Sequence, residues 1–245
     1  MNALIFAAGL GTRLKPLTDT MPKAMVPVCG KPLVQLLLER LGAAGATQVV
    51  INVHHFARQI IDFVEQNAGF GLDVRFSDET DQLLETGGGL KKAARLFTSE
   101  APILVHNVDI LSNMDLAAFY RSAVETQGQP ATLLVSERQT QRYLLADAQD
   151  RLVGWTNIAT GEVRTPYPGL DVQACRRVAF SGIQVFSPQL LPLMAAWEGK
   201  FSIIDFYLSV CHKVDIRLRV QPDLRLLDVG KLDSIREAER FLQQL

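Results

Sequence analysis

The chain has 245 residues, a length that suits one large domain or two small ones. Hydrophobic residues make up 48% and charged residues 21%, which is typical of a globular protein with an ample core and excludes a disordered chain, a collagen and a coiled coil. The 25 Lys and Arg side chains nearly balance the 26 Asp and Glu side chains, for a net charge of −1. Because no general cationic field is available to hold a polyanion, we expect no nucleic-acid partner.

Nothing in the sequence indicates export or a membrane. The apolar segment 3–8 is short and lacks the positive n-region of a signal peptide, and no run reaches the 18 apolar residues of a membrane span. Cys29, Cys175 and Cys211 are far apart and fit neither a disulfide framework nor a zinc site. We expect a cytoplasmic protein that is a monomer or a small homo-oligomer.

Apolar runs alternate with amphipathic stretches through the first half. Strands are predicted at 4–8, 48–53, 73–76 and 102–106, and helices at 33–44, 57–64 and 88–97. This alternation implies right-handed crossovers and a mostly parallel sheet.

The second half reads as short strands at 132–136, 142–146, 152–155 and 182–186, with a further strand at 225–227 and helices at 203–211 and 232–245. No linker or repeat divides the chain. The prediction is a single α/β domain over residues 1–245. It has a three-layer, Rossmann-like, mixed but mostly parallel sheet with helices on both faces, and a small antiparallel lobe at about 131–200.

The densest signal is the segment AAGLGTRLKP at 7–16, a glycine loop directly after a strand. Glycines let backbone N–H groups approach an anion closely. A dinucleotide fingerprint would need a third glycine where Leu14 stands, and Gly30-Lys31-Pro32 fails as a Walker loop. The prolines that follow predict a largely extended segment over 15–32. The loop is therefore basic and glycine-rich but belongs to neither class.

Taken with later segments, the loop resembles the signature of the sugar nucleotidyltransferases, the nucleoside-diphosphate-sugar pyrophosphorylases. The matching segments follow in order from residue 3 to about 240. They are Gly9-x-Gly11-Thr12-Arg13, PKAMVPV at 22–28, GKPL at 30–33, ETGGG at 85–89, NVD at 107–109, FSGI at 180–183 and DVG at 228–230. The first block is long and specific, and the later ones gain weight from their order.

The resemblance implies attack of a sugar 1-phosphate on the α-phosphorus of a nucleoside triphosphate, with UTP or GTP favoured, to give an NDP-sugar and pyrophosphate. Such chemistry asks for cations, a metal (here Mg²⁺) and in-line positioning. The resemblance also implies a nucleotide-binding part at about 1–130, a sugar-binding lobe at about 131–200, and a C-terminal strand and helix at 201–245.

Residue roles carry over with the motifs. By resemblance, Arg13 clamps the β- and γ-phosphates and Lys23 reaches the α-phosphate. Asp109 and Asp228 each follow a strand and match the carboxylates that hold Mg²⁺. The nucleotide is expected to contact Ala8, Gly9, Leu10, Gly11, Thr12, Glu85, Thr86, Gly87 and Asn107, and the sugar to contact Ser181, Gly182 and Asn157.

Two positions depart from the family members that use N-acetylglucosamine 1-phosphate. Phe180 stands where those enzymes have an Asn, and Gly154 stands at about the position of their Glu. The pattern looks more like the short uridylyltransferases acting on N-acetylmuramate 1-phosphate and the related hexose or heptose 1-phosphate guanylyltransferases. The residues do not separate these substrates.

Other interpretations stay open for parts of the pattern. Asp109 could be a turn residue after a strand, and Asp228 could cap the last helix. His54 and His55 point to opposite faces of a strand end, so packing roles are favoured over a shared ligand. A nucleotidyltransferase with a non-sugar acceptor such as phosphocholine, or a non-catalytic nucleotide-sugar sensor, would use the same loop.

Overall fold

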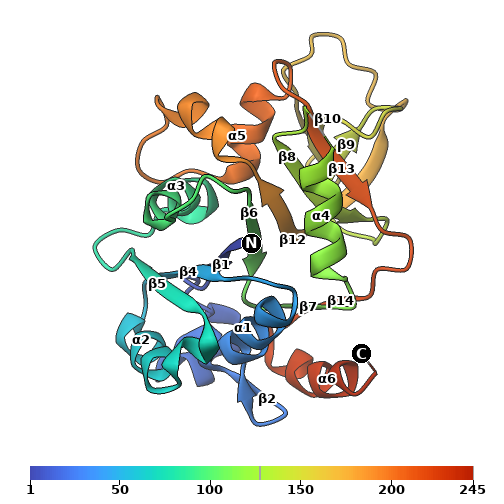
Figure 1. The fold of residues 1–245 in the computed structure, drawn as a ribbon. Helices are drawn as coiled ribbons and strands as arrows, with labels where there is room; N and C mark the ends of the chain where they lie inside the picture. Colours follow the sequence, from blue (N-terminus) through green and yellow to red (C-terminus); the bar gives the residue numbers. More distant parts are fainter. Residues whose placement is uncertain (127, 245) are drawn as a thin grey trace.

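The computed structural model describes residues 1–126 and 128–244. In these residues ten strands form one sheet in the order β11-β10-β9-β12-β6-β1-β4-β5, with β8 paired to β12 and β13 paired to β8 (Figure 1). They are β1 (Asn2–Phe6), β4 (Gln48–Val53), β5 (Asp73–Asp78), β6 (Ile103–Asn107), β8 (Ala131–Ser136), β9 (Arg142–Ala146), β10 (Leu152–Asn157), β11 (Glu162–Arg164), β12 (Arg176–Phe186) and β13 (Ile216–Val220). Two ribbons pair β2 (Pro27–Val28) with β3 (Lys31–Pro32) and β7 (Ile110–Ser112) with β14 (Leu226–Asp228).

Helices cover both faces of the sheet. Side chains of β1 alternate between two cores, with Ala3 and Ile5 in one and Leu4 in the other. The first core is closed by α1 (Leu33–Ala43), α2 (Ala57–Gln66), α4 (Leu116–Glu125) and α6 (Leu232–Leu242), and the second by α3 (Glu85–Ala93) and α5 (Ile203–Val210). This arrangement confirms the expected α/β class, including the antiparallel strands β9–β11 at one end. None of the helices among the described residues is long and apolar enough to cross a membrane.

One edge of the sheet collects the segments with the predicted motifs. Strands β1, β4, β5 and β6 run parallel, so their carboxyl ends meet there. Strand β12 runs antiparallel to β6, which returns its middle residues to the same edge. At that point its pairing with β8 shifts register between Phe180 and Gln184, and Gly182 has a φ of 73°. Bulges of this kind often re-aim side chains beside functional sites.

Most predicted elements are present with shifted ends. Strands 48–53 and 142–146 are confirmed at both ends. The helix expected at 88–97 begins earlier, at Glu85. The helix expected at 232–245 ends at Leu242, and its expected last residue, Leu245, lies outside the described residues.

The prediction of a largely extended segment over 15–32 is wrong. Single 3₁₀ turns form at Leu17–Asp19 and Lys23–Met25. Pro16 and Pro22 stand at the N-caps of these turns, where a missing backbone donor costs nothing. The prolines therefore begin short turns.

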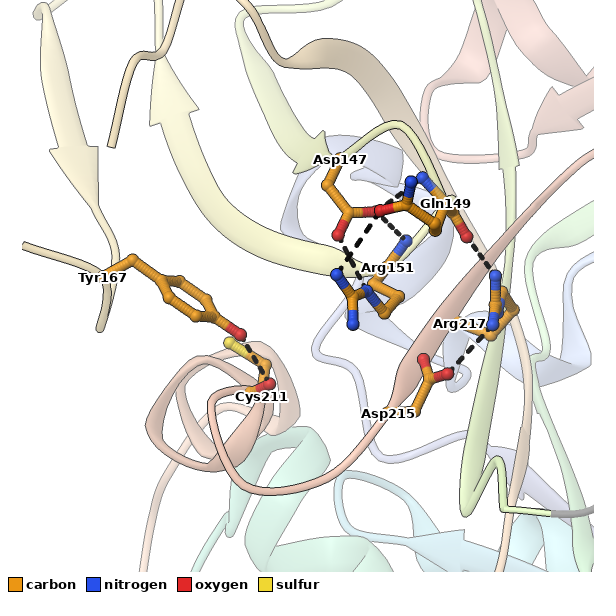
Figure 2. Close-up of polar contacts among 7 residues, drawn as sticks. All are labelled: Asp147, Gln149, Arg151, Tyr167, Cys211, Asp215 and Arg217. Atoms are coloured by element: carbon orange, nitrogen blue, oxygen red, sulfur yellow. Dashed lines mark hydrogen bonds and ion pairs between the residues drawn. The ribbon is translucent and has the colours of Figure 1, made fainter. Parts of the chain in front are cut away.

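A cluster of polar contacts ties the turn between β9 and β10 to β13 (Figure 2). Asp147 Oδ1 accepts hydrogen bonds from the backbone N–H groups of Gln149 and Arg151, both at 2.9 Å. Arg217, on β13, donates to the carbonyl oxygen of Gln149 and to Asp215 Oδ2, the latter at 2.9 Å. The turn of the antiparallel strands is thereby attached to β13, which joins the same sheet through β8.

Candidate functional site

A cavity of about 550 Å³ opens at the edge where the parallel strands end. The sequence-predicted residues brought together in its lining are Ala8, Gly9, Leu10, Gly11, Thr12, Arg13, Lys23, Glu85, Thr86, Asn107 and Asp109. Asp228 borders the cavity through its contacts with Arg13 and Lys23. Gly87, Ser181, Gly182 and Asn157 are outside this lining.

The glycine loop is held in shape by its own residues. Gly11 has a φ of 63°, a left-handed conformation that suits glycine. Its carbonyl oxygen accepts hydrogen bonds from the backbone N–H of Leu14 at 2.8 Å and from the Thr18 hydroxyl at 2.9 Å. A Cβ at Gly11 would lie 2.8 Å from Thr18 Cγ2 and 3.1 Å from Lys23 Cβ. The loop thus needs glycine here, and this packing sets Lys23 beside it.

Two cations and two carboxylates meet at the mouth of the cavity. Lys23 Nζ donates to Asp109 Oδ2 and lies 3.8 Å from Asp228 Oδ1. Arg13 Nη2 lies 3.9 Å from Asp228 Oδ2. The inner side chains are shielded, with Lys23 10% and Asp109 19% exposed, whereas Arg13 is 60% and Asp228 49% exposed. The inner pair is therefore fixed, and the outer pair is open to a ligand.

Asp109 and Asp228 are far apart in the chain but adjacent in space. In the β7–β14 ribbon Asp228 pairs with Ile110, and the backbone N–H of Val229 donates to the carbonyl oxygen of Asp109 at 2.8 Å. Spacing rules could not have found this pairing. It supports the expectation that the two carboxylates act together.

Gly230 is a site residue that sequence reasoning left without a role. A Cβ there would lie 2.7 Å from Asp228 Oδ1 and 2.8 Å from Arg13 Nη2. Only glycine leaves room for the Arg13 guanidinium beside the Asp228 carboxylate. The signal was present in the sequence, as the last residue of the motif Asp228-Val229-Gly230.

The aspartate pair is suited to a hard divalent cation. Burial, followed by the neighbouring Asp109 carboxylate, raises the pKa of Asp228 above its ordinary value, against the lowering effects of Lys23 and Arg13. No cluster of three or more His, Cys, Asp or Glu side chains suited to a metal is found in residues 1–126 and 128–244. Mg²⁺ is usually held by one or two carboxylates together with substrate phosphates, so this donor set fits Mg²⁺.

The opposite wall of the cavity is formed by the start of α3. Glu85 has a φ of 58°, a conformation that costs a non-glycine residue on the order of 1 kcal/mol. Its carboxylate lies 3.2 Å from Lys200 Nζ, and Thr86 Oγ1 accepts a hydrogen bond from the backbone N–H of Ile203 at 3.0 Å. The α3 start and the loop before α5 are thereby joined beside the cavity.

The triple glycine is helical and tightly packed. Added Cβ atoms would overlap the ring of Phe201 at Gly87 and the carbonyl oxygen of Gly199 at Gly88. The N–H of Gly87 already donates to the carbonyl oxygen of Phe201 at 2.9 Å. Gly87 therefore lets the loop before α5 approach α3 closely, and its backbone donor is occupied.

Of the residues predicted to contact the sugar, Gly182 and Ser181 lie together on β12, and Asn157 lies on β10. A Cβ at Gly182 would lie 2.8 Å from Asn107 Nδ2, which places Gly182 against the cavity wall. The Ser181 hydroxyl is buried and has no hydrogen-bond partner among the described residues. Asn157 stands apart at the end of β10, where its Oδ1 accepts from the backbone N–H of Ala159 at 3.1 Å.

Two further cavity residues were missed by sequence reasoning. Asn52, near the end of β4, and Glu79, directly after β5, both line the cavity and are almost fully buried. Asn52 follows the apolar run 49–51, a signal like the one that identified Asp109, whereas Glu79 follows the mixed strand 73–78 and carries no such signal.

Comparisons with known proteins identify the family of the chain. The family model for nucleotidyl transferase matches residues 2–244. An N-acetylmuramate α-1-phosphate uridylyltransferase of Caulobacter vibrioides is 34% identical over 211 residues, covering 84% of this chain and 82% of that protein. The enzyme of the same name from Neisseria meningitidis is 42% identical over 123 residues, covering 50% of this chain and 53% of that protein, about half its length.

Among solved structures, a putative glucose-1-phosphate thymidylyltransferase from Bacillus anthracis superposes with a TM-score of 0.82. The superposition covers 100% of this chain and 96% of that chain at 15% identity, which shows a shared fold. The family match and the Caulobacter relative go further than fold. The chain therefore belongs to the nucleotidyl transferase family, and within it to the sugar-1-phosphate nucleotidyltransferases.

Proposed function

We propose that this protein transfers a nucleotidyl group from UTP or GTP to a sugar 1-phosphate in a Mg²⁺-dependent reaction. The observation that carries the proposal is the meeting of Arg13, Lys23, Asp109 and Asp228 at the mouth of one cavity. Phosphoryl chemistry depends chiefly on positioning and charge neutralisation, and these four groups supply both.

The reaction is an in-line displacement. A phosphate oxygen of the sugar 1-phosphate attacks the α-phosphorus, the bond to the bridging oxygen of the β-phosphate breaks, and its electron pair leaves with pyrophosphate. Lys23 reaches the α-phosphate while it stays paired to Asp109, and Arg13 binds the β- and γ-phosphates as a planar fork. Mg²⁺, held by Asp109 and Asp228, would supply further charge neutralisation of the phosphates.

The remaining walls serve recognition. Backbone N–H groups of Gly9–Thr12 face the triphosphate, Glu85 and Thr86 border the base and ribose, and Gly182, packed against Asn107, borders the sugar with the buried Ser181 behind it. The names of the Caulobacter and Neisseria relatives make UTP and N-acetylmuramate α-1-phosphate the first pair to test.

The test is pyrophosphate release from each of ATP, CTP, GTP, dTTP and UTP against a panel of sugar 1-phosphates. The panel includes N-acetylmuramate, mannose and heptose 1-phosphates, with phosphocholine as a non-sugar acceptor, in Mg²⁺ and in EDTA. Release with one nucleotide–sugar pair, abolished by EDTA, is the expected outcome. Release with phosphocholine alone would move the acceptor outside the sugars. Nucleotide-sugar binding without release would indicate a sensor.

A further inference from the structure

Asn52 and Glu79 form a buried polar pair beneath the cavity. Their exposed fractions are 3% and 1%, and Asn52 Nδ2 donates to Glu79 Oε1 at 2.9 Å. Both oxygens of this carboxylate accept hydrogen bonds from neutral donors. A carboxylate buried in this way is costly to desolvate, so its presence calls for a role.

The pair connects two walls of the cavity through the backbone. Asn52 Oδ1 accepts from the N–H groups of Ala7 at 2.6 Å and Ala8 at 3.2 Å, the two peptides that lead into the glycine loop. Glu79 Oε2 accepts from the backbone N–H of Leu84 at 3.0 Å, and Leu84 is the residue directly before Glu85. One chain of hydrogen bonds thus runs from the phosphate side of the cavity to the α3 side.

The third glycine of the ETGGG motif makes room for this pair. A Cβ at Gly89 would lie 2.8 Å from Glu79 Oε1 and 3.1 Å from Asn52 Nδ2. Helix α3 can therefore lie over the pair only with glycine at this position.

We propose that the Asn52–Glu79 pair is a positioning unit for the nucleotide site, an inference that rests on the proposed function of the cavity. The pair holds the start of the glycine loop and Leu84, the residue before the strained Glu85, at a fixed separation before the nucleotide arrives. Binding then requires little further ordering of either wall, which improves affinity. Neither side chain needs to touch the nucleotide for this role.

The test exchanges the amide of Asn52 and the carboxylate of Glu79. In Asn52→Asp two carboxylates face each other, and in Glu79→Gln an amide NH₂ faces either the amide of Asn52 or the N–H of Leu84. Each single change leaves a buried hydrogen bond unmade. In the double variant N52D/E79Q, the aspartate accepts from Ala7, Ala8 and the new amide, while the glutamine oxygen accepts from Leu84. The net charge and every hydrogen bond of the pair are restored.

A matched control lies at the opposite end of the same two strands. Gln48 Nε2 donates to Asp73 Oδ2 at 2.6 Å, and Gln48 Oε1 accepts from the backbone N–H of Thr98 at 2.8 Å. Gln48→Glu therefore makes the same kind of change, away from the cavity. It is expected to lower stability and to leave the KM for the nucleoside triphosphate unchanged.

At pH 8 we expect each single variant at the Asn52–Glu79 pair to raise the KM for the nucleoside triphosphate at least about tenfold, with kcat changed less than about threefold. The KM for the sugar 1-phosphate should stay within about twofold, and N52D/E79Q should return to within about threefold of the wild type. A double variant that regains its melting temperature but not its nucleotide KM would overturn the proposal, because the Glu79 carboxylate would then act on the nucleotide directly.

A second readout does not depend on turnover. Amide hydrogen exchange of Ala8 and Leu84 should accelerate in both single variants and slow again in N52D/E79Q, and nucleotide dissociation constants from calorimetry should follow the same order. If the wild type binds nucleotide but releases no pyrophosphate, the proposed function fails while this pattern still tests the pair. Unchanged exchange at both amides in the single variants would refute the positioning role.

Discussion

Asp109 is the carboxylate on which the proposed mechanism depends most at the residue scale. It pairs with Lys23 and adjoins Asp228, so Asp109→Asn removes the proposed metal donor and releases Lys23 at once. We expect kcat/KM to fall more than about 100-fold, measured as pyrophosphate release at saturating Mg²⁺. Asp62→Asn, which breaks an exposed ion pair within α2, is the control and should keep full activity. A normal rate in Asp109→Asn would rule out its metal role.

Gly230 offers a test of geometry that leaves every charge in place. Gly230→Ala puts a methyl group 2.7 Å from Asp228 Oδ1 and 2.8 Å from Arg13 Nη2, so the two side chains must separate. A displacement of this size is expected to lower kcat/KM by about 10- to 100-fold with little change in stability. Gly42→Ala, inside α1, where the new Cβ would meet Leu72 at an ordinary 3.7 Å, should keep its activity. Equal rates for the two variants would mean that Arg13 and Asp228 tolerate displacement.

At the scale of the element, β6 carries a buried histidine that makes stability depend on pH. His106 is fully buried, its Nδ1 lies 2.8 Å from the carbonyl oxygen of Asn107, and its Nε2 has no partner among the described residues. Burial lowers the pKa of His106 to about 4, with Arg40 adding to the effect and Asp109 opposing it. The side chain is therefore neutral at pH 7.

The sign of the pH effect follows from this lowered pKa. Between the unfolded pKa of about 6.5 and the folded pKa of about 4, the unfolded chain binds more protons. Burial of the neutral His106 ring makes its full contribution to stability at pH 7. As the pH falls through this range, the free energy of unfolding decreases by up to about 3 kcal/mol. We expect urea unfolding at pH 7.0 and 4.5 to show a smaller difference in His106→Asn than in the wild type. Equal differences would contradict burial of the neutral ring.

Some strands and helices could be predicted from the sequence and others could not. Strand β4 is buried along its length and mostly apolar, and its ends were predicted correctly. The start of α3 was misplaced because the run of glycines resembles a loop, whereas in the fold these glycines are helical and pack closely against Phe201 and Gly199. Helix α4 was not predicted, although Asp115 caps it by accepting from the Ala118 N–H at 2.8 Å and its apolar residues have helical spacing. That signal was available in the sequence.

For the whole molecule, motif order identified the family, but tertiary pairing assembled the site. Arg13 and Lys23 lie close in sequence to the glycine loop and could be assigned from the motif. The approach of Asp228 to Asp109 depends on the β7–β14 ribbon, which local sequence does not encode. The Asn52–Glu79 pair was hidden for the same reason, because its meaning lies in backbone groups from two other loops.

Continuity of the main sheet leads to a prediction about cooperativity. Strand β12 pairs with β6, β8 and β9, so the antiparallel strands and the parallel strands that line the cavity share one sheet. We therefore expect residues 1–245 to unfold as one domain, in a single transition. In Trp197→Phe, the remaining Trp155 on β10 reports on the antiparallel strands, and its fluorescence midpoint in urea should coincide with that of far-ultraviolet circular dichroism.

The contacts in Figure 2 sharpen that prediction. Arg217→Ala removes the side-chain hydrogen bond from β13 to the β9–β10 turn and leaves the backbone bond from Leu218 to Asp150, and Tyr167→Phe removes the hydroxyl that donates to the carbonyl oxygen of Cys211 at 2.8 Å. In one cooperative domain, each change lowers the free energy of unfolding by about 1 kcal/mol, moves both midpoints equally, and leaves the nucleotide KM unchanged. If the Trp155 signal alone shifts to lower urea, the antiparallel strands form a separate folding unit.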